Sequence, residues 1–472
     1  MFKFDNTPKQ KSSLRWLVLL FCCISTFGDY YCFDNVGAVH NHLKSQFDFL
    51  GDRFEYYYNL LYSLYSLVNI IIPFIGGTLI KIYGNSTMFI IFGIFIILGQ
   101  LIVYIGCKNL SILTMIIGRI IFGLGGESLN ITQMAVVVDW FYKSETALPM
   151  GLTLTLSRCG SFLNDLLSPI FAGEMTKNGK LEATNAFYWG LIFSICSFIF
   201  ILILVWVIYQ KEKVCNLIQK YNDDNIMNNQ NSNNNIFHLL KNLNLLFWLI
   251  SIIILASYGS LMPFNYLSVG FFAQSPYNIS KKEAGILMGV PFLMGAIFVP
   301  LLGIIIDKYG YRCFLIIISG IFCLISFILF NFIKPYIPLI FLGFGYSIFA
   351  SVLWPAVPIV LNHKEISGFA YGISTSLQNI SMSINPMITA WILVNYNNNY
   401  LYCMIFLCLI CIFSILLSFW LYYENIKNNK ILDRVKYDDE KNIDNNKSVM
   451  EMKGVDNDKG SPNRFNELHE EI

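Results

Sequence analysis

The sequence predicts an all-α membrane protein with twelve transmembrane helices in two pseudo-symmetric bundles of six. Three observations support this fold class. Hydrophobic residues make up 55% of the 472 residues and charged residues only 13%, which is more apolar surface than one soluble core of this length buries. Apolar runs of about 20 residues, the length that crosses a bilayer, recur along the chain. A polar, Asn-rich segment separates them into two sets of six.

The apolar runs follow one another at short intervals between Leu14 and Tyr423, which leaves no room for a soluble domain between them. The first run is too long, and too polar in its later part, to be a cleaved signal peptide. The runs begin near Trp16, Tyr57, Met88, Ile112, Pro149, Ala186, Leu245, Ala284, Cys313, Pro335, Ser367 and Leu401.

Changes in composition mark the expected domain boundaries. The segment 210–243 contains four lysines and a run of asparagines, which is typical of a low-complexity linker. The segment after residue 423 is charged and nearly free of aromatic residues, which predicts disorder. We therefore expect a cytosolic N-terminal tail (1–14), a six-helix bundle (15–209), a cytosolic linker (210–243), a second six-helix bundle (244–423) and a disordered cytosolic tail (424–472).

The basic residues indicate an orientation. With the N-terminus in the cytosol, 22 of the 32 Lys and Arg fall in cytosolic segments and 8 in the opposite loops. Membrane proteins keep such an excess on the cytosolic side. Both termini and the linker are therefore expected there.

Charge and motifs exclude several functions. The net charge of +2 provides no basic stripe for a phosphate backbone, so nucleic acid is not an expected partner. The five His lie outside the spans, and neither His-Glu-x-x-His nor Gly-x-Gly-Asp occurs. We therefore expect no enzyme, no metal and no cofactor. Most of the 12 Cys stand in apolar runs and are interpreted as small core residues.

A repeated turn indicates two homologous halves. Gly303-Ile-Ile-Ile-Asp307-Lys308-Tyr-Gly310-Tyr-Arg312 follows span eight, and Gly77-Thr-Leu-Ile-Lys81-Ile-Tyr-Gly84 follows span two, 226 residues earlier. Here the sequence resembles the major facilitator superfamily, whose signature is such a turn, although Lys81 replaces the acid of the first copy. We expect gating residues at these cytosolic ends: Asp307, Lys308, Arg312 and, at the end of span four, Asp139.

Ionisable residues inside the spans are the candidate site. A charge at mid-bilayer costs about 2.5–3.5 kcal/mol on insertion scales, so it usually faces a cavity or a partner. Glu127 lies 12 residues from the cytosolic end of span four and Arg158 lies 9 residues from the start of span five. At about 1.5 Å per residue, both side chains are expected near the middle of the membrane.

Two interpretations of this pair remain open. Glu127 and Arg158 could form a structural salt bridge, or they could hold the ammonium and carboxylate ends of a zwitterion. We expect Asp34, Tyr65, Asn69 and Asn164 beside them in the substrate site. Arg119 is interpreted as structural, either snorkelling or binding backbone carbonyls.

The second half offers no ionisable side chain at mid-depth. Trp354, Tyr371 and Gln378 are the expected substrate-facing residues there, because they can supply an apolar wall, a cap or hydrogen bonds. Asp29, Asp34 and Asp165 are further acids within the spans and are candidate proton sites.

Several strings resemble one branch of the superfamily, the lysosomal dipeptide transporters. The strings are Thr26-Phe27-Gly28, Gly125-Gly126-Glu127-Ser128-Leu129, Leu353-Trp354-Pro355 and Ala370-Tyr371-Gly372. The resemblance implies dipeptide export to the cytosol by alternating access from a lysosome or lysosome-like vacuole, with Glu127 and Arg158 holding the two substrate termini. It also implies a glycosylated single-span accessory subunit.

Other functions remain as alternatives. The chain could be a proton-coupled carrier of organic anions, amino acids or sugars, or a sensor that transports nothing. The plasma membrane is the alternative location. An essential Glu127 would count against a sugar carrier, because sugar sites favour uncharged amides and aromatic rings.

Overall fold

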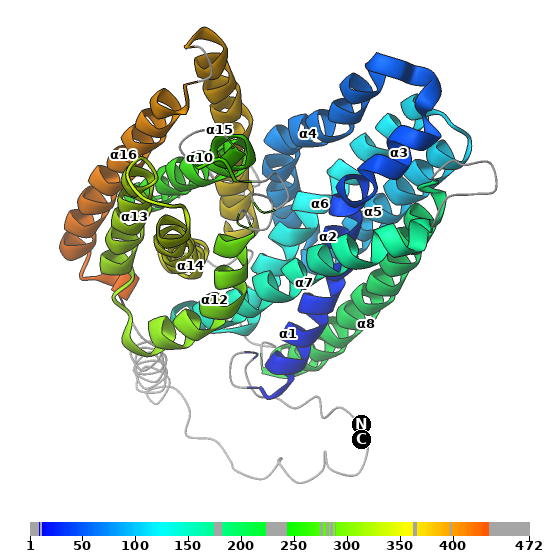
Figure 1. Ribbon diagram of the computed structural model, residues 1–472. Helices are drawn as coiled ribbons and strands as arrows, with labels where there is room; N and C mark the ends of the chain where they lie inside the picture. The colour runs from blue at the N-terminus through cyan, green and yellow to red at the C-terminus, as the bar shows by residue number, and fades with distance from the viewer. Residues whose placement is uncertain are drawn as a thin grey trace, which may run out of the picture.

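The computed structural model describes residue 9 and residues 12–173, 182–222, 243–273, 277–279, 283, 287, 289–361, 366–396 and 399–433. Over these residues the regular secondary structure is helical, which confirms the predicted all-α class. The helices α1 to α8 form one bundle and α10 to α16 form a second bundle beside it (Figure 1).

The first bundle contains the six predicted spans of the N-terminal half. Its first span is bent rather than continuous, because α1 ends and α2 begins on either side of Thr26. The Thr26 hydroxyl lies 2.9 Å from Ser157 Oγ and accepts a hydrogen bond from Gln133 at 3.1 Å, so polar contacts fix the bend. The elements are α1 (Leu14–Ser25), α2 (Phe27–Ala38), α3 (His40–Gln46), η1 (Asp48–Arg53), α4 (Phe54–Tyr83), α5 (Asn85–Lys108), α6 (Ile112–Trp140), η2 (Lys143–Glu145), α7 (Ala147–Ala172) and α8 (Thr184–Asn222).

The second bundle contains the remaining spans. The predicted start of span eight near Ala284 lies outside the described residues, and the helix of that span is described from Val290. The elements are α10 (Leu245–Ala273), α12 (Val290–Tyr309), α13 (Arg312–Leu329), α14 (Tyr336–Ile359), α15 (Ser367–Asn395), α16 (Tyr400–Lys427) and η4 (Ile431–Asp433).

The chain remains helical beyond two of the predicted boundaries. α8 continues to Asn222, past the linker boundary predicted after residue 209. α16 continues to Lys427 and η4 follows it, so the prediction of disorder from residue 424 is wrong for its first ten residues. Leu432 is fully buried, which explains why this segment is folded. Residues 223–242 and 434–472 lie outside the described part.

Ten helical stretches of the described chain are long and apolar enough to cross a membrane. α7 and α15 are not among these ten, because polar residues interrupt them, including Arg158 in α7 and Gln378 in α15. They are the fifth helices of their bundles and both contact the other bundle. Polar side chains there can avoid lipid, as intramembrane polar groups usually do.

The turn repeat of the sequence has a matching backbone. Gly84, between α4 and α5, has φ +81°, and Gly310, between α12 and α13, has φ +74°. Residues with side chains rarely adopt these values. The two glycines are 226 residues apart, the same offset as the sequence repeat.

The two bundles contact each other near one end, which we call the linker side: the end at which α8 finishes and α10 starts. There α4 packs against α15 and α7 against α12. A Cβ added at Gly303 would lie 2.7 Å from Leu148 Cα, and one added at Gly77 would collide with the carbonyl oxygen of Gly368. Because glycines allow these backbones to touch, the bundles are closed together on the linker side.

Candidate functional site

Glu127 lies on α6 in a glycine-rich segment that brings other helices close. A Cβ added at Gly126 would lie 2.8 Å from the Tyr65 hydroxyl of α4 and 3.2 Å from Asp29 Oδ1 of α2. A bulkier residue at this position would push both side chains away. The glycine therefore gathers Asp29 and Tyr65 beside the half-buried carboxylate of Glu127.

Arg158 lies on α7 and points towards the boundary between the bundles. Its guanidinium carbon is 5.4 Å from the ring centre of Tyr30 in α2 and 5.9 Å from that of Phe292 in α12, which belongs to the other bundle. Such cation–π contacts contribute roughly 0.5–2 kcal/mol each. Its Nε is buried and has no hydrogen-bond partner among the described residues.

Glu127 and Arg158 are close enough to interact electrostatically. Nevertheless, neither forms an ion pair or a hydrogen bond with another residue in the described part of the chain. A structural salt bridge would satisfy both charges, so that interpretation does not fit this conformation. Two opposite, unpaired charges in one place are suited to a zwitterionic ligand.

Two other buried polar side chains, on α2 and α4, are also without partners. Asp29 is only 5% exposed and its Oδ1 accepts no hydrogen bond from the described residues; Asn69 is 1% exposed, and neither its amide nitrogen nor its oxygen is paired within them. Burying a polar group without a partner costs about 1–3 kcal/mol. These side chains, with Tyr65, therefore extend a polar surface that water or a ligand can satisfy.

Asp34 and the two polar residues of α7 occupy different surroundings. Asp34 is half-buried on α2 and interacts electrostatically with Arg158 and Arg119. Asn164 donates to Asp165 Oδ1 at 3.3 Å and accepts from Ser168 Oγ at 2.6 Å, so both ends of its amide are occupied. Asp165 itself is exposed. The structure thus places Asp34 near the charged pair and engages Asn164 in contacts along α7.

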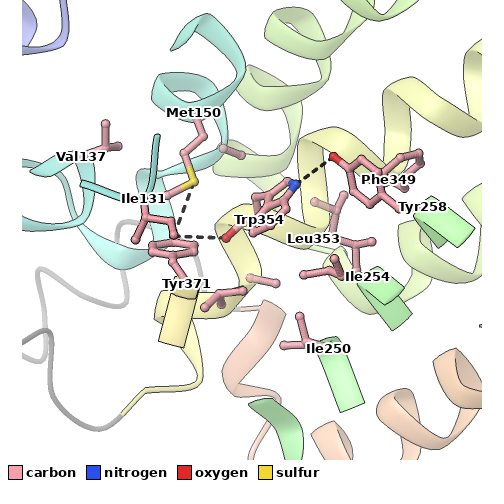
Figure 2. Packing of buried hydrophobic residues seen from close by; sticks show 14 of the residues in the cluster. Ile131, Val137, Met150, Ile250, Ile254, Tyr258, Phe349, Leu353, Trp354 and Tyr371 are labelled. Atoms are coloured by element: carbon pink, nitrogen blue, oxygen red, sulfur yellow. Dashed lines mark hydrogen bonds between the residues drawn. The ribbon is translucent and has the colours of Figure 1, made fainter. Parts of the chain in front are cut away.

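Trp354 and Tyr371 form a buried cluster with residues of both bundles (Figure 2). The Trp354 indole donates to the Tyr258 hydroxyl at 3.0 Å. The Tyr371 hydroxyl donates to the Trp354 carbonyl at 3.2 Å and lies 3.7 Å from Met150 Sδ of α7. Tyr371 is completely buried, so in this conformation it packs between the bundles. Gln378 is half-buried, and its amide lies 3.6 Å from Met382 Sδ.

The aromatic residues that surround Arg158 were not among the predicted site residues. Tyr30, Tyr258 and Tyr346 all interact electrostatically with its guanidinium, and Phe292 contacts it through the ring. Three of these four come from the second bundle. Tyr258 and Tyr346 each stand within a Gly/Ser-rich stretch of an apolar span, which is a weak signal that sequence reasoning could have used.

Arg119 is a structural residue, and of the two interpretations offered for it the structure shows carbonyl binding. It is 1% exposed and donates to the carbonyls of Leu61, Cys32 and Phe33 at 3.1–3.4 Å. Four aromatic rings lie around its guanidinium at 5.3–5.5 Å. These contacts join α2, α4 and α6 behind the candidate site.

The expected gating residues cluster on the linker side. Asp307 accepts hydrogen bonds from the backbone N–H groups of Ala147 and Leu148 at 3.0 and 2.9 Å, and so caps α7 from the opposite bundle. Arg312 lies 3.5 Å from Asp307 and donates to the carbonyls of Ser144 at 2.6 Å and Leu432 at 3.1 Å.

The other two expected gating residues make local contacts. Lys308 lies over the ring of Tyr309 at 5.1 Å. Asp139 accepts from the amide of Asn85 at 2.8 Å, within the first bundle. Across the described residues, no group of three His, Cys, Asp or Glu side chains is arranged to hold a metal ion.

The fold and the polar surface between two six-helix bundles define a membrane transporter, and comparison identifies its family. The profile of the Major Facilitator Superfamily matches residues 19–272 and 247–451. The chain belongs to this superfamily. It is therefore a multi-pass membrane transporter and not an enzyme, as the sequence predicted.

Relatives of known description make the resemblance more specific. The chain is 30% identical over 421 residues to the protein named lysosomal dipeptide transporter MFSD1 of Danio rerio, covering 87% of this chain and 88% of that one. It is also 30% identical over 415 residues to the Homo sapiens protein of the same name, covering 87% and 86%. Among solved structures, the E. coli fucose:proton symporter FucP superimposes with a TM-score of 0.65 at 13% identity, covering 86% of this chain and 99% of that one. That likeness concerns the fold alone.

Proposed function

We propose that this protein carries dipeptides across the membrane by alternating access, with Glu127 binding the substrate ammonium group and Arg158 its carboxylate. The observation that carries the proposal is the pair itself: two opposite charges that interact electrostatically but form no hydrogen bond or ion pair within the described residues. A zwitterion supplies both missing partners. The names of the relatives from Danio rerio and Homo sapiens support the same substrate class.

We infer that the substrate is a dipeptide and not a single amino acid. Glu127 and Arg158 come from different helices and do not touch, whereas an amino acid carries both charges on one carbon atom. A dipeptide separates its termini by one more residue, about 3.3–3.6 Å of extended chain. Because the clamp grips only the termini, it tolerates many side chains.

The transport cycle follows from the closed linker side. In this conformation Asp307 and the glycine contacts hold the bundles together there, so substrate enters from the opposite side. Arg158 of one bundle already contacts Phe292 of the other, so a substrate bound there lies at the boundary about which the bundles rock. We propose that the linker side faces the cytosol and that the opposite side faces the lumen of a lysosome or lysosome-like vacuole.

Proton-coupled transport is a second candidate, and Asp29 favours it. Its carboxylate is buried beside Glu127 with one oxygen unpaired in the described structure. A carboxylate placed this way could carry a proton together with the substrate.

A glycosylated single-span accessory subunit is the partner we propose from the family resemblance, and co-purification from native membranes tests it.

The clamp is tested in proteoliposomes containing the full-length protein. We expect Arg158→Ala and Glu127→Gln each to reduce dipeptide uptake at least 100-fold, because each leaves one substrate terminus without its charge-assisted contacts, worth roughly 1.5–3 kcal/mol apiece. Glu424→Gln is the matched control, because this carboxylate lies at the linker-side end of α16 and pairs with Lys427. Normal uptake by both clamp variants would show that the proposed site is wrong.

A further inference from the structure

The chain folds back onto the second bundle after its last span. Asn429 has φ +53°, which turns the backbone beyond α16 and leads into η4. Leu432 of η4 is completely buried. The Asn425 amide donates to Asp433 Oδ2 at 2.9 Å, and its oxygen accepts from the Leu432 N–H at 3.0 Å. Residues 425–433, which we call the C-terminal segment, are therefore anchored by one apolar side chain and one buried amide.

The turn between α12 and α13 is shaped to receive this segment. A Cβ added at Gly310 would collide with the carbonyl oxygen of Asp433. One added at Gly84, the equivalent glycine of the first bundle, would meet no atom of the described residues within 4 Å. Asp433 Oδ1 also accepts from the Cys313 N–H at 3.3 Å. The close approach to the C-terminal segment is therefore a property of the second copy of the turn repeat.

Arg312 connects the C-terminal segment to the opposite bundle. Its guanidinium is completely buried and donates to the Leu432 carbonyl at 3.1 Å and to the Ser144 carbonyl at 2.6 Å. Ser144 belongs to η2 of the first bundle, directly before α7. Because the guanidinium is planar and presents its donors in a fixed fork, an acceptor on one side sets the direction of the donors on the other.

We propose that the C-terminal segment is a clasp: it holds Arg312 against the first bundle and thereby stabilises the conformation in which the linker side is closed. When the bundles separate there, the contact of Arg312 with Ser144 has to break, whereas its contact with Leu432 lies within the second bundle. Detaching the segment should therefore shift the protein towards conformations open on the linker side. This inference goes beyond the proposed function and does not depend on what is transported.

Hydrogen–deuterium exchange of the full-length protein in detergent, without substrate, tests the clasp. Leu432→Ala removes most of the apolar surface that anchors the segment, so we expect the first amides of α7 to exchange roughly tenfold faster as the bond of Arg312 to Ser144 is lost. Asp433→Asn is the matched control. It weakens the contact with α13 but keeps the Leu432 anchor and its carbonyl, so α7 should exchange as in the wild type.

A double variant shows whether the effect passes through Arg312. Arg312→Gln alone removes the bridge between the bundles and should itself raise the exchange of α7. In that background Leu432→Ala should change the exchange of α7 by less than about twofold, because two substitutions that break the same connection do not add. An undiminished increase would mean that the segment acts on α7 by another route.

A second pair of variants applies if Leu432→Ala does not fold. Gly310→Ala displaces the segment by colliding with the Asp433 carbonyl, and Gly84→Ala is its matched control. Both glycines have positive φ, so both substitutions strain the backbone, but only the first meets the segment. We expect only Gly310→Ala to speed the exchange of α7.

The outcomes separate the clasp from the proposed function. Exchange of α7 at the wild-type rate when the segment is detached, or the same increase with and without Arg312, would overturn the inference. Since these measurements contain no substrate, faster exchange of α7 in a protein that carries no dipeptide would refute the dipeptide assignment and leave the clasp in place.

Discussion

Three arginines in this protein show how the same side chain serves different roles according to its partners. Arg119 is satisfied by three carbonyls and four rings, and Arg312 by Asp307 and two carbonyls. Arg158 has aromatic neighbours but no hydrogen-bonded acceptor in the described structure. An arginine with acceptors stabilises the fold, whereas one without them is available to a ligand.

This contrast predicts opposite effects of two substitutions on stability. Arg119→Ala leaves three buried carbonyls without their donor and opens a cavity, so we expect a loss of about 3–5 kcal/mol. Arg158→Ala removes two cation–π contacts of roughly 0.5–2 kcal/mol each but also a buried charge that lacks an acceptor, so the two effects offset each other and the loss should be well below that of Arg119→Ala. Thermal unfolding of the purified protein in detergent measures both. An Arg158→Ala protein that melts as early as Arg119→Ala would show that Arg158 is structural.

At the scale of the elements, two aspartates cap helices in different ways. Asp307 accepts from the first N–H groups of α7, which belongs to the other bundle. Asp433 of η4 accepts from the Cys313 N–H of α13 at 3.3 Å, within the second bundle. Helix capping contributes about 0.5–2 kcal/mol. Only the first contact has to break when the bundles separate on the linker side.

Hydrogen–deuterium exchange distinguishes these two caps. We expect Asp307→Asn to raise the exchange rate of the amides at the start of α7 roughly 5- to 30-fold, because the closed state loses an interaction between the bundles. Asp433→Asn should increase exchange at the start of α13 and leave α7 unchanged. Equal protection of α7 in wild type and Asp307→Asn would show that this contact does not hold the linker side closed.

At the scale of the whole molecule, the coupling of transport follows from which charges the substrate replaces. In the clamp that we propose, a dipeptide would satisfy Glu127 and Arg158 together, so no proton would be needed to neutralise it. Asp29 is the feature that opposes this view, because it is buried beside Glu127. The two possibilities differ in whether protons move with the substrate.

Vesicles with a pH-sensitive dye inside measure this directly. We expect dipeptide entry at clamped membrane potential to leave the lumen pH unchanged, as in a uniporter. Acidification of the lumen in step with uptake would establish proton coupling instead. In that case Asp29→Asn should abolish the acidification while preserving facilitated uptake, which would identify the proton site.

The sequence by itself determined the fold class, the twelve spans and the repeat, and it marked Glu127 and Arg158 as candidate site residues. These features depend on composition and periodicity along the chain, because bilayer thickness fixes helix length and a buried charge is costly wherever it lies. The site assignments remain predictions that the proposed experiments address. The disorder expected from residue 424 was wrong for residues 424–433, because burial of Leu432 depends on distant helices.

Only the tertiary structure decided which polar groups lack partners and which side chains meet across the bundles. In the sequence, Arg119 and Arg158 are both arginines within an apolar span. In the structure, Arg119 donates hydrogen bonds to carbonyls of α2 and α4, whereas aromatic rings of α2 and α12 lie around Arg158. Tyr258 of α10 and Tyr346 of α14, which also interact electrostatically with Arg158, are likewise 88 positions apart in the chain. Periodicity shows which face of a helix is polar, but the packing of the helices determines which groups that face meets.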